Sequence, residues 1–363
     1  MGLLRRGQQA VLWSRRHDAA YEGRSVRWKK DNVYGFLFVH LIAGLSFFPW
    51  FFSWTGVALL GVGIFVFGLL GINLCYHRLL THRGFSCPLW CEHTLAIFGV
   101  CAVQDSPPHW VAVHRRHHQF ADEDNDPHSP LAGLFWAHMG WLLVKMEDMG
   151  RRSLIEQYAK DIVRDPLYAW IERRSNWIKI ALGSWVAYVA VGFGVIVLSG
   201  GVLRDAVQFG LSLFVWGAAL RTVLLWHLTW SVNSVTHIWG YRNYGTPDVS
   251  RNNALIALIA GGEGWHNNHH ADSRSARHGH KWWEIDLTWM VIRLLMLLGL
   301  ARNVAVPSPT LAAKFNAAGQ RLAPPEQESW ARKAIYARTQ SDADRIDAPW
   351  QLLHHLLWFR SLR

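Results

Sequence analysis

Histidines at regular spacings are the residues of this sequence best suited to chemistry. Nine of its 20 histidines fall into four groups: His77 and His82; His114, His117 and His118; His237; and His266, His269 and His270. Side chains at the spacing i, i+3, i+4 project from one helical face, so we expect each triplet to converge on a shared point. Neutral imidazole binds iron, zinc, copper and nickel well, whereas magnesium and calcium prefer oxygen. The pattern therefore predicts a transition-metal site.

The other two groups indicate how many metal ions to expect. His77 and His82 are separated by about 140° around a helix, so they should reach different points or straddle a helix end. Asn233 and His237 lie one turn apart on a single face, a pair that alone is typical of a hydrogen-bonded side chain at an interface. This spread favours two metal ions over one. Zinc enzymes usually use three protein ligands and one open position, so this many histidines indicates paired redox metals, with iron as the first choice.

The four cysteines indicate a reducing environment. They lie within one segment and include no Cys-x-x-Cys pair: Cys75, Cys87, Cys91 and Cys101. They are too few and too clustered for a disulfide framework. Cys87 and Cys91 could bind a metal, although small buried hydrophobic side chains are their commoner role.

Composition places these groups in a membrane protein. Only 17% of the 363 residues are charged, against roughly 25% in an ordinary soluble domain, and 22 are Trp, a residue enriched at membrane surfaces. The net charge of +11 could indicate a nucleic-acid partner. We predict none, because the basic residues share the chain with stretches too apolar for such a protein.

Long uncharged stretches predict the elements that position the histidines. The stretch from Asn32 to His77 holds no charged residue and exceeds twice the roughly 20 residues of one span, so it should form two spans, 33–51 and 55–76, with a break near Pro49. Two further spans, 178–199 and 206–232, should form a second hairpin. Arg221 should lie near the outer interface and extend its charge to water.

The fold class predicted is all-α: four transmembrane helices in two hairpins, with the long middle segment on the cytoplasmic side. Residues 1–32 form a basic interfacial segment, and 303–363 form a cytosolic tail with a possible second interfacial helix. Eight Lys and Arg in the first 30 residues, against one Arg in the second hairpin link, place both termini in the cytoplasm.

The motifs resemble those of a known family. The segments His77–Arg83, His114–His118, Asn233–His237 and Gly262–His270 look like the histidine boxes of membrane fatty acid desaturases of the stearoyl-CoA, or Δ9, type. The resemblance extends over roughly residues 33–300. The segment Gly-Glu-Gly-Trp-His-Asn-Asn-His-His is more similar to the corresponding segment of the bacterial, cyanobacterial and plant enzymes than to that of the animal enzymes.

The resemblance implies a fold, a function and a set of iron ligands. The fold would be four transmembrane helices in two hairpins with a cytosolic helical cap, formed by 77–175 and 238–302 within a desaturase domain of 33–302, and the cap would hold a histidine-ligated di-iron site. The reaction would be O2-dependent formation of a cis double bond, most commonly Δ9, in a saturated acyl chain carried on CoA or a glycerolipid. The nine grouped histidines would bind two iron ions, and Asn233 would act through a water. No His-Pro-Gly-Gly cytochrome b5 signature occurs, so a separate donor with its reductase would supply electrons: cytochrome b5, a ferredoxin or a rubredoxin-like protein.

Other residues are expected around this centre. Acidic residues flank the clusters, and we expect some to accept hydrogen bonds from ligand imidazoles, with Glu263, Asp126 and Asp272 as candidates. Candidates for contact with the acyl chain are Trp110, Phe65 and Leu69. Animal acyl-CoA enzymes have Trp-x-Arg-Asp where this chain has Trp110-Val-Ala-Val, so CoA recognition is in question.

Two alternative functions remain open at this stage. A di-iron lipid hydroxylase would use the same ligands and the same membrane substrate. A metal transporter would need ionisable groups along a path through the membrane, yet the clusters lie at the cytoplasmic edge of the spans. The sequence thus favours an integral, multi-pass desaturase, more in keeping with a bacterial plasma membrane than with the endoplasmic reticulum.

Overall fold

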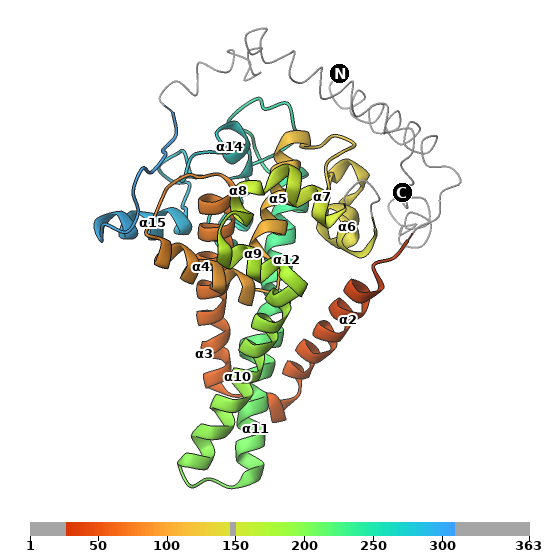
Figure 1. Cartoon of the computed structure of the whole chain (residues 1–363), viewed down its shortest axis with the longest axis vertical. Helices are drawn as coiled ribbons and strands as arrows, with labels where there is room; N and C mark the ends of the chain where they lie inside the picture. The colour runs from red at the N-terminus through yellow and green to blue at the C-terminus, as the bar shows by residue number, and fades with distance from the viewer. Residues whose placement is uncertain (1–26, 146–149, 309–363) are drawn as a thin grey trace. The chain divides into compact units, whose positions relative to one another are not determined.

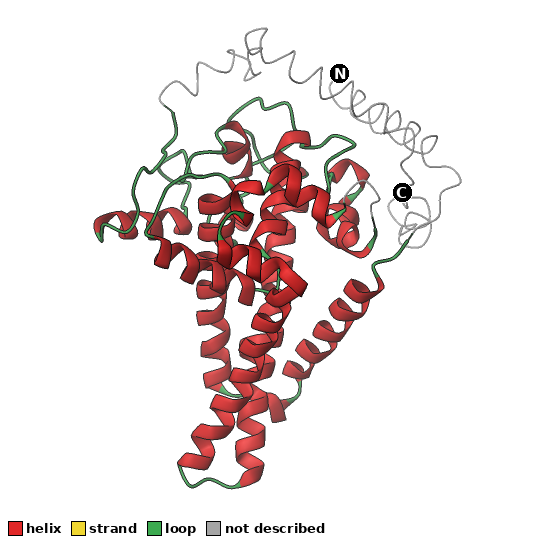
Figure 2. Ribbon diagram, viewed as in Figure 1, coloured by secondary structure: helices red, strands yellow, loops and turns green. Residues whose placement is uncertain are grey.

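The computed structural model describes residues 27–145 and 150–308. Over these residues the chain is helical, with four isolated β-bridges and no strand (Figure 2). The all-α prediction is therefore confirmed for this part of the chain. The basic segment 1–32 and the tail 303–363, with its possible interfacial helix, lie largely outside the described residues.

The α-helices vary widely in length, and the longest contribute to the candidate membrane spans. In chain order they are α2 (Lys30–Gly44), α3 (Trp54–Gly63), α4 (Leu89–Cys101), α5 (Pro107–Phe120), α6 (Trp141–Leu143), α7 (Arg151–Tyr158), α8 (Lys160–Val163), α9 (Pro166–Glu172), α10 (Asn176–Leu198), α11 (Leu203–Phe214), α12 (Arg221–Ser234), α13 (Ala254–Ile259), α14 (His266–Ala271) and α15 (Leu287–Leu297). Three segments are π-helical: η3 (Ile64–Thr81), η5 (Trp136–Gly140) and η7 (Val215–Leu220). The 3-10 turns are η1 (Leu45–Phe47), η2 (Pro49–Phe51), η4 (Pro130–Ala132), η6 (Arg173–Ser175) and η8 (Val235–His237).

The described chain divides into two compact units. The smaller includes 27–33 and 140–145, which are joined by a backbone hydrogen bond from Lys29 N–H to the Leu143 carbonyl at 2.8 Å. The larger includes 34–139 and 151–308 and contains all nine grouped histidines. The rest of the description concerns this larger unit.

Three helical segments are long and apolar enough to cross a membrane: Trp54–Thr81, Pro166–Leu198 and Leu203–His237. They coincide with three of the four predicted spans. The predicted first span, 33–51, is not one continuous helix, because α2 ends at Gly44 and the chain continues as the 3-10 turns η1 and η2. The first residue of η2 is Pro49, which has no N–H to continue a helical ladder.

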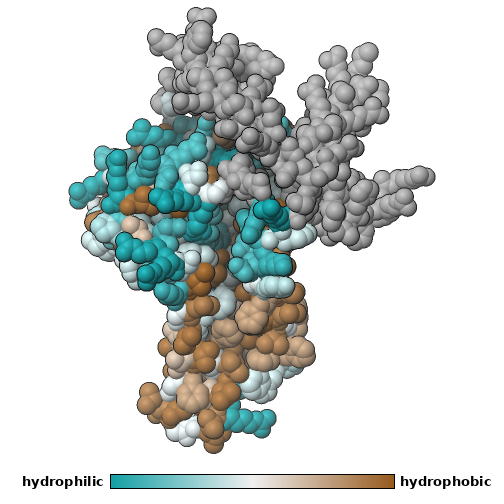
Figure 3. Space-filling view, turned by 45° about the vertical axis from the view of Figure 1, so that its right-hand side comes forward, coloured by the Kyte–Doolittle hydropathy of each residue, from teal (hydrophilic) through white to brown (hydrophobic). Residues whose placement is uncertain are grey.

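Close glycine contacts hold α10 and α11 together as the predicted second hairpin (Figure 1). A Cβ built on Gly192 of α10 would lie 2.8 Å from the Cα of Gly210 of α11, so larger residues would force the helices apart. The link turns through Gly200 at φ +77°, a conformation that glycine adopts without strain. Hydrophobic side chains gather over this hairpin, and hydrophilic side chains gather over the helices around the histidines (Figure 3).

Arg221 does not lie where the sequence predicts. It is fully buried, donates hydrogen bonds to the carbonyls of Cys101 at 2.5 Å and Gly217 at 3.1 Å, and places its guanidinium 4.5 Å from the ring centre of Phe67. Cys101 is the last residue of α4, where carbonyls lack helical partners and carry the negative end of the helix dipole. The charge is thus satisfied by α4 rather than by water at the outer interface.

Candidate metal centre

The histidine triplets split between two groups instead of each converging on one point. His114 and His118 of α5 lie with one group, and His117 lies with the other. The helical geometry explains this division, since at about 100° per residue the i+4 side chain lies 40° to one side of the first and the i+3 side chain 60° to the other. In α14 the same rule separates His269 from His266 and His270. The prediction of one shared point per triplet is therefore wrong.

The five-histidine group draws on three separate parts of the chain. Its potential ligand atoms all lie within 4.8 Å of one another, and its members are His77, His82, His114, His118 and His269. The Nε2 atom of His269 lies 3.1 Å from that of His77 and 2.9 Å from that of His118. These short distances bring nitrogen lone pairs toward a common centre.

The four-histidine group combines α5, α14 and the end of the third long helix. Its members, also within 4.8 Å of one another by their ring nitrogens, are His117, His237, His266 and His270. The Nε2 atoms of His117 and His270 lie 3.3 Å apart. Asn233 lies in α12 one turn before His237, and its contact with a metal through water stays a prediction.

The π-helical winding of η3 explains why His77 and His82 meet. The segment runs over 18 residues, and the backbone N–H of His82 bonds to the carbonyl of His77, five residues earlier, at 3.2 Å. A π-helix has more residues per turn than an α-helix, so the angle of about 140° expected for an α-helix does not apply. The expectation that the pair reaches different points is wrong, whereas the alternative, a pair straddling the helix end, describes the structure because the helix ends at Thr81.

Carboxylates lie behind four of these imidazoles. Glu263 accepts a hydrogen bond from His77 Nδ1 at 2.5 Å, and Asp126 accepts one from His117 Nδ1 at 3.0 Å. Asp122 lies 2.9 Å from His237 Nδ1, and Asp248 lies 3.2 Å from His270 Nδ1. Each contact places the N–H on the outer nitrogen, so that Nε2 presents its lone pair to the centre.

Two of the three acidic residues named from the sequence, Glu263 and Asp126, do accept hydrogen bonds from grouped histidines. Asp272 lies elsewhere and accepts a hydrogen bond from the backbone N–H of Ser308 at 3.1 Å. Asp248 was missed, because it lies 22 positions before His270 in a loop, and no spacing rule relates loop residues to a helix. Only its position between two histidine boxes could have suggested it.

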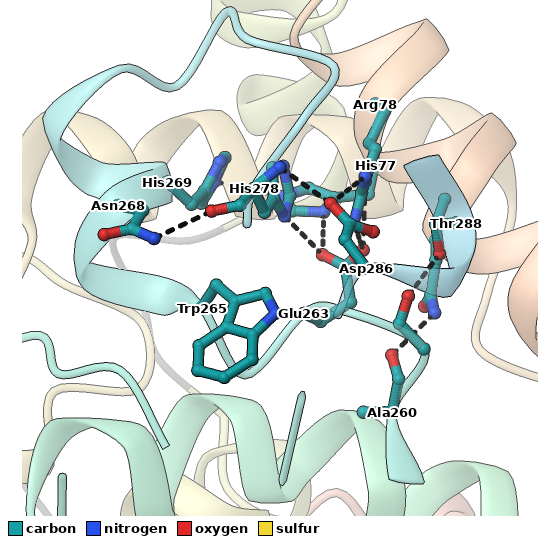
Figure 4. Close-up of polar contacts among 12 residues, drawn as sticks. His77, Arg78, Ala260, Glu263, Trp265, Asn268, His269, His278, Asp286 and Thr288 are labelled. Carbon is teal, nitrogen blue, oxygen red and sulfur yellow. Dashed lines mark hydrogen bonds and ion pairs between the residues drawn. The ribbon is translucent and has the colours of Figure 1, made fainter. Parts of the chain in front are cut away.

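A buried arginine fixes the carboxylate behind His77 (Figure 4). Arg78 is 1% exposed and donates to Glu263 Oε1 at 2.8 Å and to Asp286 Oδ2 at 2.9 Å. Asp286 also accepts the backbone N–H of Trp289 and so caps α15. This network connects the end of η3 to two loops that are distant in sequence.

Two further histidines adjoin the groups. His278 is 1% exposed, and its ring centre lies 4.5 Å from that of His269, with Nδ1 3.5 Å from Glu263. His128 lies 4.3 Å from the ring centre of His117. Each belongs to a smaller group of potential ligand atoms, one with His77 and Glu263, the other with His117 and Asp126. The sequence assigned neither residue to the centre.

Burial favours the neutral form of three imidazoles in the five-histidine group, and the charge of the carboxylate behind a fourth is compensated. Burial, and then neighbouring histidines, hold the pKa of His114, His118 and His269 well below the usual range. Burial raises the pKa of Glu263, but Arg78 and His77 outweigh it, so the net shift is downward. Neutral imidazoles backed by carboxylates are the form in which histidine binds metal.

Unsatisfied nitrogens provide a direct test of whether the residues fit a metal. His82 Nε2, His237 Nε2 and both ring nitrogens of His266 are buried without a hydrogen-bond partner. An unpaired buried polar atom is costly, and metal ligation would satisfy several at once. The two groups therefore fit two nitrogen-ligated metal ions.

The three residues proposed to contact an acyl chain differ in position. Trp110 stacks on His114, with ring centres 5.1 Å apart, so it borders the five-histidine group. Leu69 is buried, and its side chain lies close to Gly261. Phe65 is 47% exposed, which places it on an outer face of the helix. Cys87 and Cys91 belong to none of the groups of potential metal ligands in the described chain.

Comparisons with known proteins identify the family. The model of the fatty acid desaturase family matches residues 48–297. The sn-1 stearoyl-lipid 9-desaturase of Anabaena variabilis is 42% identical over 273 residues, which is 75% of this chain and 92% of that protein. The enzyme of the same name from Synechocystis sp. is 40% identical, over 77% of this chain and 81% of the relative. The icosanoyl-CoA 5-desaturase of Limnanthes douglasii is also 40% identical, over 79% and 75%.

The chain belongs to the fatty acid desaturase family. It is therefore an oxidoreductase of lipid metabolism that acts on fatty acyl chains. Its relatives favour neither a lipid hydroxylase nor a metal transporter.

Proposed function

We propose that the protein is an O2-dependent acyl-lipid Δ9 desaturase with a nonheme di-iron centre. The observation that carries the proposal is the pair of histidine groups, one of five and one of four, each backed by carboxylates. Two iron ions held there would activate O2 for removal of two hydrogen atoms from adjacent methylene carbons. The reaction balances as R–CH2–CH2–R′ + O2 + 2 electrons + 2 H+ giving R–CH=CH–R′ + 2 H2O.

The residues of the chain divide the work. The nine histidines would hold the two ions, with Asn233 acting through a water on one of them. Four carboxylates fix the orientation of four of these imidazoles through contacts with their outer nitrogens: Glu263, Asp126, Asp122 and Asp248. Because most of the grouped histidines are under 10% exposed, the centre is shielded from bulk water, which limits side reactions of O2.

We propose a glycerolipid as the acyl carrier. The positions at which animal acyl-CoA enzymes have Arg and Asp are Ala112 and Val113 here, and both side chains are buried in α5. These residues offer no charge to a CoA phosphate. The names of the cyanobacterial relatives support the choice of a lipid-linked chain and of the 9 position.

The membrane arrangement proposed has four spans, with α2 and the turns after it as the first. Both termini and the histidine groups would face the cytoplasm, where a separate one-electron carrier, cytochrome b5, a ferredoxin or a rubredoxin-like protein, would deliver electrons together with its reductase. The proposed organisation keeps a basic segment 1–32, a catalytic domain 33–302 and a tail 303–363, in a bacterial plasma membrane.

Expression in a host without its own desaturase tests the function. We expect cis-Δ9 monounsaturated acyl chains in the membrane lipids, and their absence despite O2 and a supplied electron donor would contradict the proposal. His269→Ala should abolish the product, since His269 Nε2 faces two other imidazoles. His93→Gln, which changes a histidine paired with Asp165 at 2.9 Å outside the groups, is the matched control. Membrane assays with stearoyl-CoA against a stearoyl glycerolipid distinguish the carriers.

A further inference from the structure

One of the grouped imidazoles needs a partner for its outer nitrogen. His269 directs Nε2 into the five-histidine group, 3.1 Å from His77 Nε2 and 2.9 Å from His118 Nε2, so Nδ1 is the nitrogen that faces away. This Nδ1 is buried and has no hydrogen-bond partner among the described residues. A histidine that binds a metal through one nitrogen almost always donates the N–H of the other to an acceptor. His269 therefore requires an acceptor for Nδ1.

His278 is a neighbouring side chain with the chemistry to supply this acceptor. Its imidazole is 1% exposed, its ring centre lies 4.5 Å from that of His269, and the two ring planes are inclined by 37°. Both nitrogens of His278 are buried, and neither has a hydrogen-bond partner in the part of the chain that the structure describes. Two adjacent imidazoles with unpaired nitrogens can satisfy each other, by one N–H···N hydrogen bond or through one bridging water.

The backbone around His278 fixes where this imidazole lies (Figure 4). The backbone N–H of His278 donates to Asp286 Oδ2 at 2.7 Å, and its carbonyl accepts from Asn268 Nδ2 of α14 at 2.9 Å. The next residue is Gly279, on which a Cβ would overlap the Glu284 carbonyl. Backbone contacts thus hold the loop against α14, and the imidazole keeps both of its nitrogens for other partners.

A neighbouring carboxylate sets which nitrogen of His278 carries the hydrogen. His278 Nδ1 lies 3.5 Å from Glu263 Oε2, the oxygen that accepts the outer N–H of His77 at 2.5 Å. Burial, and then the charge of Arg78, hold the pKa of His278 well below its usual range, so the ring is neutral and has one donor and one acceptor. Because a carboxylate only accepts, the hydrogen belongs on Nδ1 and the lone pair on Nε2. That lone pair is the acceptor that His269 requires.

We propose that His278 is a positioning residue for the five-histidine group. It accepts the outer N–H of His269 and directs its own N–H toward Glu263. One carboxylate then orients two ligands of the same metal ion, His77 directly and His269 through His278. This role rests on the proposed function, because it requires iron in the five-histidine group. Both the orientation of an imidazole and the electron density on its inner nitrogen depend on such a partner.

The rival role for His278 is to fill space beside His269. His278→Leu keeps a bulky side chain but removes both hydrogen-bonding nitrogens, whereas His278→Gln restores a donor and an acceptor. For a positioning residue, we expect His278→Leu to lower the affinity of the metal-depleted protein for one of two Fe(II) ions by about 10-fold to 100-fold. His278→Gln should recover most of this affinity. A residue that only fills space would be replaced at least as well by Leu as by Gln.

Mössbauer spectra of the iron-loaded variants test the same role without a measurement of turnover. We expect the quadrupole doublet of one iron to change in His278→Leu and that of the other iron to stay as in the wild type. His280→Leu is the matched control, since His280 lies in the same loop, pairs with the Tyr244 hydroxyl at 3.0 Å and belongs to neither histidine group of the described chain. It should keep both affinities and both doublets.

The outcomes separate this role from the proposed function. Wild-type Fe(II) affinities and spectra in His278→Leu would overturn the positioning role alone, and so would equal losses of affinity in the Leu and Gln variants. A wild-type protein that binds no iron, or forms no double bond, would instead overturn the proposed function.

Discussion

At the scale of single residues, the important feature is that charged groups act on the centre through the histidines. Glu263 lies between His77 and Arg78, so one carboxylate both receives the imidazole N–H and neutralises a buried guanidinium. Such an outer partner fixes the tautomer and increases the electron density on the inner nitrogen. A neutral amide in its place can accept the imidazole N–H, but it adds less electron density to the inner nitrogen and leaves the Arg78 guanidinium without this counter-charge.

Glu263→Gln should therefore weaken metal binding at the five-histidine group. Loss of an outer partner typically costs 10-fold to 100-fold, or about 1.4–2.8 kcal/mol, in metal affinity. We expect bound iron, measured by elemental analysis after mild chelation, to fall from two toward one per chain. Asp272→Asn is the control, because Asp272 bonds to the Ser308 backbone, and it should retain both ions. Two ions held equally well by Glu263→Gln would contradict the role assigned to Glu263.

At the scale of elements, the winding and close approach of helices decide which histidines meet. The spacing of the boxes predicted that two groups of ligands exist, because imidazoles at i, i+3 and i+4 are rare without a metal. It did not predict the division of each triplet, which requires the partner helix, nor the π-helical form of η3, which has no sequence signature here. Arg221 was misplaced for the same reason, since the receiving carbonyl of Cys101 lies 120 residues away.

Packing of α4 on η3 positions His77 through glycine contacts. A Cβ on Gly71 would lie 2.4 Å from the Gly99 backbone nitrogen, and one on Gly99 would lie 2.3 Å from the Tyr76 ring. Gly71→Ala should thus push the helices apart, lowering stability by about 1–3 kcal/mol. We expect a lower unfolding temperature and reduced iron content. Gly61→Ala lies in the same long helix with nothing within 4 Å, and it should leave both quantities unchanged.

At the scale of the whole molecule, an ionic network ties the loop before α5 to two other helices. Arg151 at the start of α7 donates to Asp105 at 2.6 Å and to Glu172 of α9 at 2.6 Å. Burial raises the pKa of Asp105, but His109 and Arg151 outweigh it and hold the pKa well below its usual range. The contacts made by Asp105 therefore stabilise the fold only while Asp105 is ionised, whereas the ion pair of Arg151 with Glu172 does not depend on that charge.

The pH dependence of stability follows from this shift. A carboxyl whose pKa is depressed by folding contributes fully above its unfolded pKa, near 4, and loses that contribution as the pH falls further. We expect the unfolding temperature of the purified protein to drop below about pH 4. Asp105→Asn should be less stable at neutral pH by about 1–3 kcal/mol and should flatten the acid side of the profile. If the unfolding temperature of Asp105→Asn varied with pH as it does in the wild type, Asp105 would not contribute to the pH dependence of stability.

The number of membrane crossings in the whole molecule depends on α2, the shortest of the four proposed spans. Its 15 residues extend about 22 Å, less than the roughly 30 Å of a bilayer core, and the 3-10 turns to Phe51 must complete the crossing. If α2 crosses, Asp31 lies in the cytoplasm and Phe52 lies outside. In a variant without the native cysteines, Phe52→Cys in intact cells should react with a membrane-impermeant maleimide, whereas Asp31→Cys should react only after the cells are opened. Labelling of both in intact cells would show that α2 stays on the outer face, and would place the N-terminus outside because the helix Trp54–Thr81 makes the first crossing.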